Sequence, residues 1–170
     1  MRIPSAVTTT MLAFGVSAPV GGLATSAVAN AALAIDGTYS ATSDGQWAKT
    51  NSRYHDEATV ISMWTIHTTC KSPYDCSGTV SSDRGWTAQV YTKNVQWRVD
   101  RDLPNWEPCP SGEMGHGRQI YTFSPVGPDG QMALDSTTFT GFDKTTGDSG
   151  ACGKNQWLVV EMPFKLVKVA

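Results

Sequence analysis

The sequence lacks the patterns that would place it in a helical, membrane-spanning or nucleic-acid-binding class. No segment shows a convincing helical periodicity, and no apolar run after residue 34 is long enough to span a bilayer. Charge is sparse, with 13 Lys and Arg against 15 Asp and Glu and a net charge of −2. A slightly acidic chain is a poor partner for nucleic acid or for an anionic membrane surface. We therefore predict neither a nucleic-acid partner nor a membrane span.

The chain is also poor in histidine, and its metal-capable groups have no regular spacing. Of the three histidines, only His55 lies in a dense cluster, His55-Asp56-Glu57. Adjacent residues on a strand point to opposite faces, so this cluster is better explained as a solvated segment than as an ion site. The Cys-x5-Cys spacing of Cys70 and Cys76 is not that of a zinc knuckle. We predict no metal and no cofactor.

No complete catalytic constellation can be read from the sequence. Gly147-Asp-Ser-Gly150 matches the first four residues of the serine-protease nucleophile motif, in which Ser149 would attack, but the motif fails at Ala151. His67 lies in a predicted strand, outside the sequence context of a protease histidine. The acids form many pairs without a glycosidase signature. We assign no catalytic residue and keep one alternative, a secreted hydrolase that uses a loop carboxylate, either Glu107 or another loop acid.

The first 34 residues have the character of a secretory signal. Arg2 supplies a short positive start, and an apolar stretch of small residues follows over 11–29. Small-x-small cleavage signals end at Ala29 and at Ala34, so we expect cleavage between 29 and 34 and a single mature domain over 35–170. Neither cleavage site has an adjacent cysteine to carry a lipid. The predicted location is secreted or in the cell envelope, outside the cytoplasm.

Four cysteines in an exported chain favour two disulfides. Three connectivities are compatible with the sequence. We predict the pairs Cys70–Cys76 and Cys109–Cys152, because the first pair spans a hairpin turn and the second joins two loops rich in Gly and Pro.

Most of the mature chain alternates between short β-type segments and turn signals. The central one is a hairpin from Thr59 to about Ser81, whose first half is mostly β-branched or aromatic. The eight predicted strands lie at 36–45, in the two halves of this hairpin, and at 85–92, 95–101, 118–124, 132–142 and 156–169. Pro163 in the last of them indicates a bulge, a bend or an edge position.

This order predicts an all-β fold, and the connections leave no room for crossover helices. Residues 103–117 and 143–155 are expected to be loops. Eight antiparallel strands in series can close into an up-and-down barrel of the lipocalin or avidin kind, with a two-sheet β-sandwich as the alternative. Such a barrel is either filled by its own side chains or holds one small ligand.

Six tryptophans are a heavy load for a domain of this size. Tryptophans at strand positions are expected in the core, where each ring buries a large apolar area. Trp47 and Trp106 fall in predicted loops, and Glu107 is the acid that follows Trp106. These three residues are our tentative ligand-binding residues.

Four motifs carry a resemblance to known proteins. They are Asp36-Gly-Thr-Tyr, Cys70-x5-Cys76, Asn105-Trp-Glu-Pro-Cys-Pro-x-Gly112, and Thr140-Gly-Phe-Asp-Lys-Thr-Thr-Gly-x-Ser-Gly-Ala-Cys152. On them the chain resembles small mycobacterial secreted proteins of unknown function and, more loosely, the extracellular domains of some mycobacterial serine/threonine kinases. The resemblance implies secretion, two disulfides and a sensing or binding role. Our leading hypothesis is non-catalytic binding of a small apolar or envelope-derived ligand, or of a protein partner.

Overall fold

The structure is a computed structural model that describes residues 34–72 and 74–169. The predicted signal peptide and the region of its cleavage lie outside these residues, except for Ala34, and both stay predictions. Within the described residues no helix is long and apolar enough to cross a bilayer.

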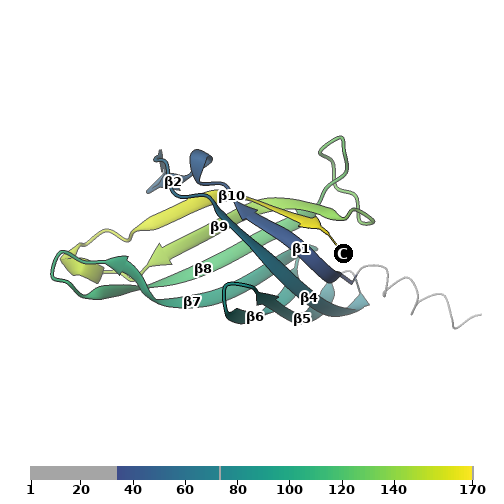
Figure 1. Cartoon of the computed structure of the whole chain (residues 1–170), viewed down its shortest axis with the longest axis horizontal. Helices are drawn as coiled ribbons and strands as arrows, with labels where there is room; N and C mark the ends of the chain where they lie inside the picture. The colour runs from purple at the N-terminus through teal and green to yellow at the C-terminus, as the bar shows by residue number, and fades with distance from the viewer. Residues whose placement is uncertain (1–33, 73, 170) are drawn as a thin grey trace, which may run out of the picture.

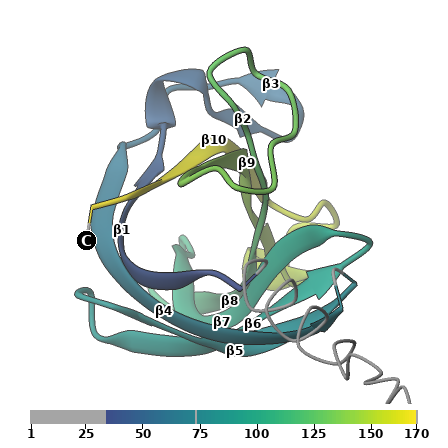
Figure 2. The same ribbon diagram turned by 90° about the vertical axis from the view of Figure 1, so that its right-hand side faces the viewer.

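Eight long antiparallel strands form one closed barrel (Figures 1 and 2). The strands are β1 (Asp36–Ser43), β4 (Val60–Ser72), β5 (Asp75–Ser82), β6 (Trp86–Lys93), β7 (Gln96–Pro108), β8 (Met114–Pro125), β9 (Thr138–Gly147) and β10 (Val159–Lys168). They follow one another around the barrel in chain order, and β1 closes it by pairing with both β4 and β10. The predicted up-and-down barrel is confirmed, and the sandwich alternative is wrong.

One insertion interrupts this simple order. Between β1 and β4 the chain forms a 3-10 turn, η1 (Gly45–Trp47), and a small hairpin of β2 (Lys49–Thr50) and β3 (Arg53–Tyr54). The hairpin pairs with β10 on the outside of the barrel. We call residues 44–59 the insertion.

The interior follows from strict alternation along the strands. In β4, residues 62, 64, 66 and 68 are buried while their neighbours are exposed, as expected for a strand with one face in a core. Trp64, 1% exposed, lies at the centre, with ring centroids of Tyr121 at 4.9 Å and Phe164 at 5.3 Å. The barrel is therefore filled by its own side chains.

The strand tryptophans meet the expectation of core packing with one exception. Trp64 and Trp97 are buried, and Trp86 packs against the same core. Trp157 is 55% exposed, because β10 begins only at Val159. The last predicted strand was therefore placed too early in the chain.

The expected loop over 103–117 is wrong, because strands occupy most of it. β7 runs on to Pro108 and β8 starts at Met114, with an irregular register between Leu103 and Glu107. The prolines are tolerated here because the pairing of β6 with β7 ends at Val90–Val99. Beyond Val99 the side of β7 that faced β6 has no partner strand, and proline is compatible with such an edge. The density of Pro and Gly concealed strand pairing that only the partner strand reveals.

The second expected loop, 143–155, and the seventh predicted strand, 132–142, both begin later in the structure than predicted. β9 continues to Gly147, so the loop begins later than expected, and a second 3-10 turn, η2 (Ala151–Gly153), follows it. β9 begins at Thr138 rather than at 132, and Met132 makes only an isolated bridge to Val126.

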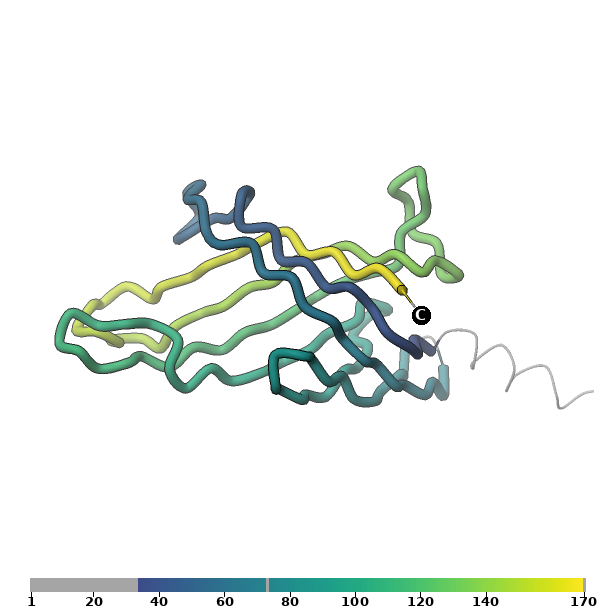
Figure 3. The backbone as a smooth tube through the Cα atoms, viewed as in Figure 1, coloured from purple at the N-terminus to yellow at the C-terminus, as the bar shows by residue number. Residues whose placement is uncertain are grey.

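The far ends of β7 to β10 project beyond the body of the barrel (Figure 3). We call residues 103–117 and 147–158 the distal arm. Its two halves are tied by the Cys109–Cys152 disulfide, while Cys70–Cys76 joins β4 to β5. Both predicted pairings are confirmed.

The two disulfides should differ in their contribution to stability. Their cysteines are 43 and 6 residues apart, so the loop-entropy relation gives about 4 kcal/mol for the long loop and about 2 kcal/mol for the short one. Urea unfolding of the two double Cys→Ala variants should show the larger loss for Cys109 and Cys152. The opposite order would show that loop entropy does not govern their stabilities.

Candidate functional site

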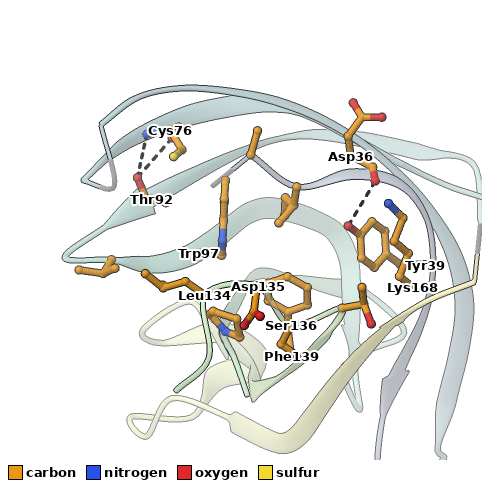
Figure 4. Close-up of a pocket in the computed structure, with 15 residues that line it drawn as sticks. Asp36, Tyr39, Cys76, Thr92, Trp97, Leu134, Asp135, Ser136, Phe139 and Lys168 are labelled. Carbon is orange, nitrogen blue, oxygen red and sulfur yellow. Dashed lines mark hydrogen bonds between the residues drawn. The ribbon is translucent and has the colours of Figure 1, made fainter. Parts of the chain in front are cut away.

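A hollow of about 210 Å³ opens at the end of the barrel where β1 begins and β10 ends (Figure 4). Its deep part is lined by Tyr39, Trp97 and Phe139, and charged groups of Asp36, Asp135 and Lys168 line it as well. This volume is below the range of about 300 to 1,000 Å³ typical of small-molecule pockets. It can take a small ring or one end of a longer molecule. We call it the mouth hollow.

The deep part of the mouth hollow belongs to the barrel core. Tyr39 and Phe139 meet edge to face with centroids 6.1 Å apart, and Phe139 meets Phe123 in the same way at 5.9 Å. Core side chains are held in single rotamers by close packing. The aromatic lining is therefore fixed before any ligand arrives.

Trp97 presents an unused hydrogen-bond donor to the mouth hollow. The residue is only 4% exposed, and its indole Nε1 has no acceptor among the described residues. By contrast, the other fully packed tryptophan, Trp64, donates from Nε1 to Ser62 Oγ at 3.0 Å. No buried side-chain nitrogen or oxygen among the described residues lacks a partner, so this N–H opens onto the solvent of the hollow. In Figure 4 the nitrogen of Trp97 lies at the end of the ring nearest Leu134 and Asp135.

The polar groups around the hollow are held by local hydrogen bonds. Ser136 Oγ donates to Val126 O at 2.6 Å and thereby fixes the base of the long connection between β8 and β9. The backbone N of Cys76 donates to Thr92 Oγ1 at 2.9 Å, so the disulfide hairpin forms part of the wall. Burial raises the pKa of the Tyr39 hydroxyl, which stays protonated and donates to Asp36 O at 3.4 Å.

The predicted ligand-binding residues do not line this hollow. Trp47 is 61% exposed on the insertion, far along β10 from the mouth, where its ring meets Tyr54 edge to face at 6.5 Å. Trp106 is half-buried in the distal arm and lies against Gly117, where an added Cβ would come within 2.7 Å of its ring. The structure keeps Trp106 and Glu107 together and places Trp47 in a separate groove.

Glu107 is buried in the distal arm rather than open to a substrate. It is 6% exposed, and its Oε1 lies 3.6 Å from Lys154 Nζ across the arm. Ideal Cβ positions on Gly115 and Gly147 would lie 3.4 Å from its side chain. The carboxylate thus braces the two halves of the arm beside the Cys109–Cys152 disulfide.

The other candidate groups are also accounted for by structure. His116 lies between Asp102 at 3.6 Å and Asp148 at 3.3 Å, so its partners are carboxylates and not Ser149. His67 is a strand residue, as expected, and pairs with Asp36 at 2.9 Å. Among the described residues, no group of three or more His, Cys, Asp or Glu is placed to hold a metal ion.

Sequence reasoning missed the residues that form the mouth hollow. In the sequence pattern these residues are ordinary inward-facing strand positions. They are Tyr39 of β1, Trp97 of β7 and Phe139 of β9. Only the closure of the barrel brings these strands to one end. A signal was present for Tyr39 alone, in the Asp36-Gly-Thr-Tyr motif that carries part of the resemblance.

A buried carboxylate, Asp143, lies inside the barrel. It is 1% exposed and accepts hydrogen bonds from Ser43 Oγ at 2.6 Å and from Gln119 Nε2 at 2.8 Å. Burial raises the pKa of Asp143, against the lowering effects of these two hydrogen bonds and of Arg101. The group therefore keeps its proton to higher pH in the folded protein than in the unfolded chain.

This shift predicts a pH-dependent contribution to stability. A raised folded-state pKa stabilises the fold below the ordinary pKa of 3.8, and the contribution is lost as the pH rises through the folded-state value. Wild type should therefore lose stability relative to Asp143→Asn as the pH is raised from 3.8 through the folded-state pKa. Urea unfolding of both proteins over a pH series, with Asp129→Asn in an exposed turn as the control, checks it. A difference that grows in favour of wild type would contradict the raised pKa.

Comparisons with known proteins bear on the fold only. No model of a known protein family matches the chain, and no curated protein matches it. Among solved structures, the chain is similar to the monomer form of the PknI sensor domain of M. tuberculosis, with a TM-score of 0.58 and 15% identity over 81% of this chain and 88% of that one. The looser part of the resemblance drawn from the sequence is thus supported at the level of fold. The two disulfides are typical of domains outside the reducing cytosol.

Proposed function

We propose that this protein is a non-catalytic binding domain, secreted or held in the cell envelope, that takes a small ligand in the mouth hollow. The observation that carries the proposal is the Nε1–H of Trp97, which makes no hydrogen bond to another described residue and lies in the same wall as the rings of Tyr39 and Phe139. This donor opens onto solvent, so a ligand that carries an acceptor replaces a hydrogen bond to water with one to the protein, a net gain of about 1 kcal/mol.

The lining defines the class of ligand. Tyr39 and Phe139 favour an apolar group, and Trp97 favours a hydrogen-bond acceptor next to it. Of the charged groups, Asp36 already has a partner in His67, which leaves Asp135 and Lys168 to select the polar end. We expect the apolar end of an envelope-derived molecule that carries a carbonyl or similar acceptor. A protein partner that inserted one side chain would use the same contacts.

The fold is consistent with this role. Because the core fills the barrel, a ligand can bind at one end of the barrel but not in its interior. The sensor domain to which the chain is similar shares this fold. Fold alone does not determine function. The proposal therefore depends on the chemistry of the mouth hollow.

The first test is direct observation of the Trp97 indole by ¹H–¹⁵N NMR. Benzamide, hexanamide and N-acetyl-leucine amide join an apolar group to a carbonyl acceptor, while hexylamine lacks the acceptor. The amides should shift the Trp97 Nε1–H signal, and Trp97→Phe should weaken binding by about 1 kcal/mol, roughly fivefold.

Trp157→Phe is the matched control, because Trp157 is exposed and lies outside the hollow. It should bind the amides like wild type. Equal binding by Trp97→Phe, or shifts confined to residues away from the hollow, would overturn the proposal.

The alternative function is hydrolysis with Glu107, the acid singled out from the sequence, but its burial leaves the carboxylate closed to a substrate. Its ion pair with Lys154 and its place in the arm favour bracing instead. We expect Glu107→Gln to lower the free energy of unfolding by about 1 kcal/mol, since one partner of the pair is solvent-exposed. Lys154→Gln should cost about as much. Turnover of an ester, glycoside or peptide by wild type that is lost in Glu107→Gln at unchanged stability would instead establish the hydrolase.

A further inference from the structure

A second hollow lies on the outer surface of the barrel, and three exposed aromatic side chains surround it. Trp47, Tyr54 and Phe142 are 61%, 71% and 52% exposed, and a groove of about 200 Å³ lies between them. Lys49, Glu161 and Pro163 complete its lining. We call it the outer groove. Large apolar side chains gathered at one surface point are uncommon unless they bind something.

The insertion holds these rings in place without burying them. Its base is anchored by Gly45 N, which donates to Thr59 Oγ1 at 3.0 Å, and by Ala48, which is 1% exposed. Its tip is a tight turn in which Asn51 exchanges two hydrogen bonds of 2.8 Å with the backbone of Val159. Trp47 and Tyr54 are thus presented to solvent by a segment that is firmly attached at both ends.

The geometry of the rings forms a corner. Trp47 and Tyr54 meet at 75°, with centroids 6.5 Å apart, so two flat faces bound the groove at nearly a right angle. Phe142 reaches the groove from β9, where it is paired with Pro163 of β10. Flat aromatic faces accept flat apolar surfaces, including the C–H face of a sugar ring.

Polar groups of both kinds lie in the same groove. Glu161, Lys49 and Tyr54 form one row across β10, β2 and β3. Lys49 Nζ lies 5.2 Å from the centre of the Tyr54 ring, and Lys144 Nζ lies 3.9 Å from Glu161 Oε2. The groove therefore offers an ammonium donor and a carboxylate acceptor beside its aromatic faces.

These features together exclude most ligand classes. An acyl chain would desolvate Lys49 and Glu161 without giving them hydrogen bonds, which is costly. A small anion would meet Glu161, and a small cation would meet Lys49 and Lys144. A neutral ring with one apolar face and hydroxyl groups at its edge satisfies every group at once.

We propose that the outer groove is a saccharide-binding site that takes one neutral sugar ring. The ring stacks on Trp47, and its hydroxyl groups accept from Lys49 and donate to Glu161. The site lies on a different part of the barrel from the mouth hollow and shares none of its lining residues, so it stands or falls independently of the function proposed above.

The probes are the methyl glycosides of glucose, galactose, mannose and arabinose, titrated to about 100 mM because single-ring binding is typically weak. ¹H–¹⁵N NMR should show a saturable shift of the Trp47 indole and of the Lys49 and Tyr54 amides with at least one of them. Trp47→Ala and Tyr54→Ala should each weaken this binding about tenfold or more.

The matched control is Trp157→Ala, which removes a tryptophan that is 55% exposed, against 61% for Trp47, and lies outside the groove; it should leave binding unchanged. Thermal unfolding of each variant shows whether the barrel is intact. The absence of a saturable shift with all four glycosides, or a shift that persists in Trp47→Ala, would overturn the proposal. So would tighter binding of octanoate than of any glycoside at the same residues, since it would identify an acyl groove.

Discussion

The pairing of β1 with β10 is the contact on which the rest of the structure depends. It joins the beginning and the end of the described chain over five residue pairs, from Tyr39–Lys168 to Ser43–Phe164. Without it the eight strands would form an open sheet with two free edges and a solvent-exposed aromatic face. With it, Trp64, Tyr121 and Phe164 meet in one core, and the side chains that line the mouth hollow come within reach of one another.

The parts of the fold that could be predicted are those encoded locally. The alternation in β4, and the Cys70 and Cys76 that flank its turn, need only neighbours in sequence to be interpreted. The barrel followed from the count and order of such segments. The arm could not be predicted in the same way, because Pro104 and Pro108 are compatible with a strand only where no neighbour requires their missing N–H, and that depends on where β6 diverges.

The same distinction explains the outcome for the candidate sites. Trp47 was singled out because it sits in a polar, irregular stretch, and this local signal was enough to predict its exposure. Trp97 was not, because its strand pattern is that of any core residue, and its free indole N–H is visible only once the barrel is closed. A composition-based search finds aromatic groups on loops; it overlooks a core residue whose one polar atom opens onto a hollow.

Pro163 has a consequence that reaches beyond its own strand. Its carbonyl accepts a hydrogen bond from Asp44 N, so its nitrogen faces the same side of β10. On that side Pro163 lies in a gap, because the pairing of β10 with β1 stops at Phe164 and its pairing with β2 covers only Val160 and Glu161. Any other residue here could donate its backbone N–H to the chain after β1. The ladder between β1 and β10 could then continue, and the insertion would lie against β10. Because proline offers none, the chain branches away from the sheet here, and the floor of the outer groove is left uncovered. The missing N–H of Pro163 thus sets the position of the outer groove on the barrel surface.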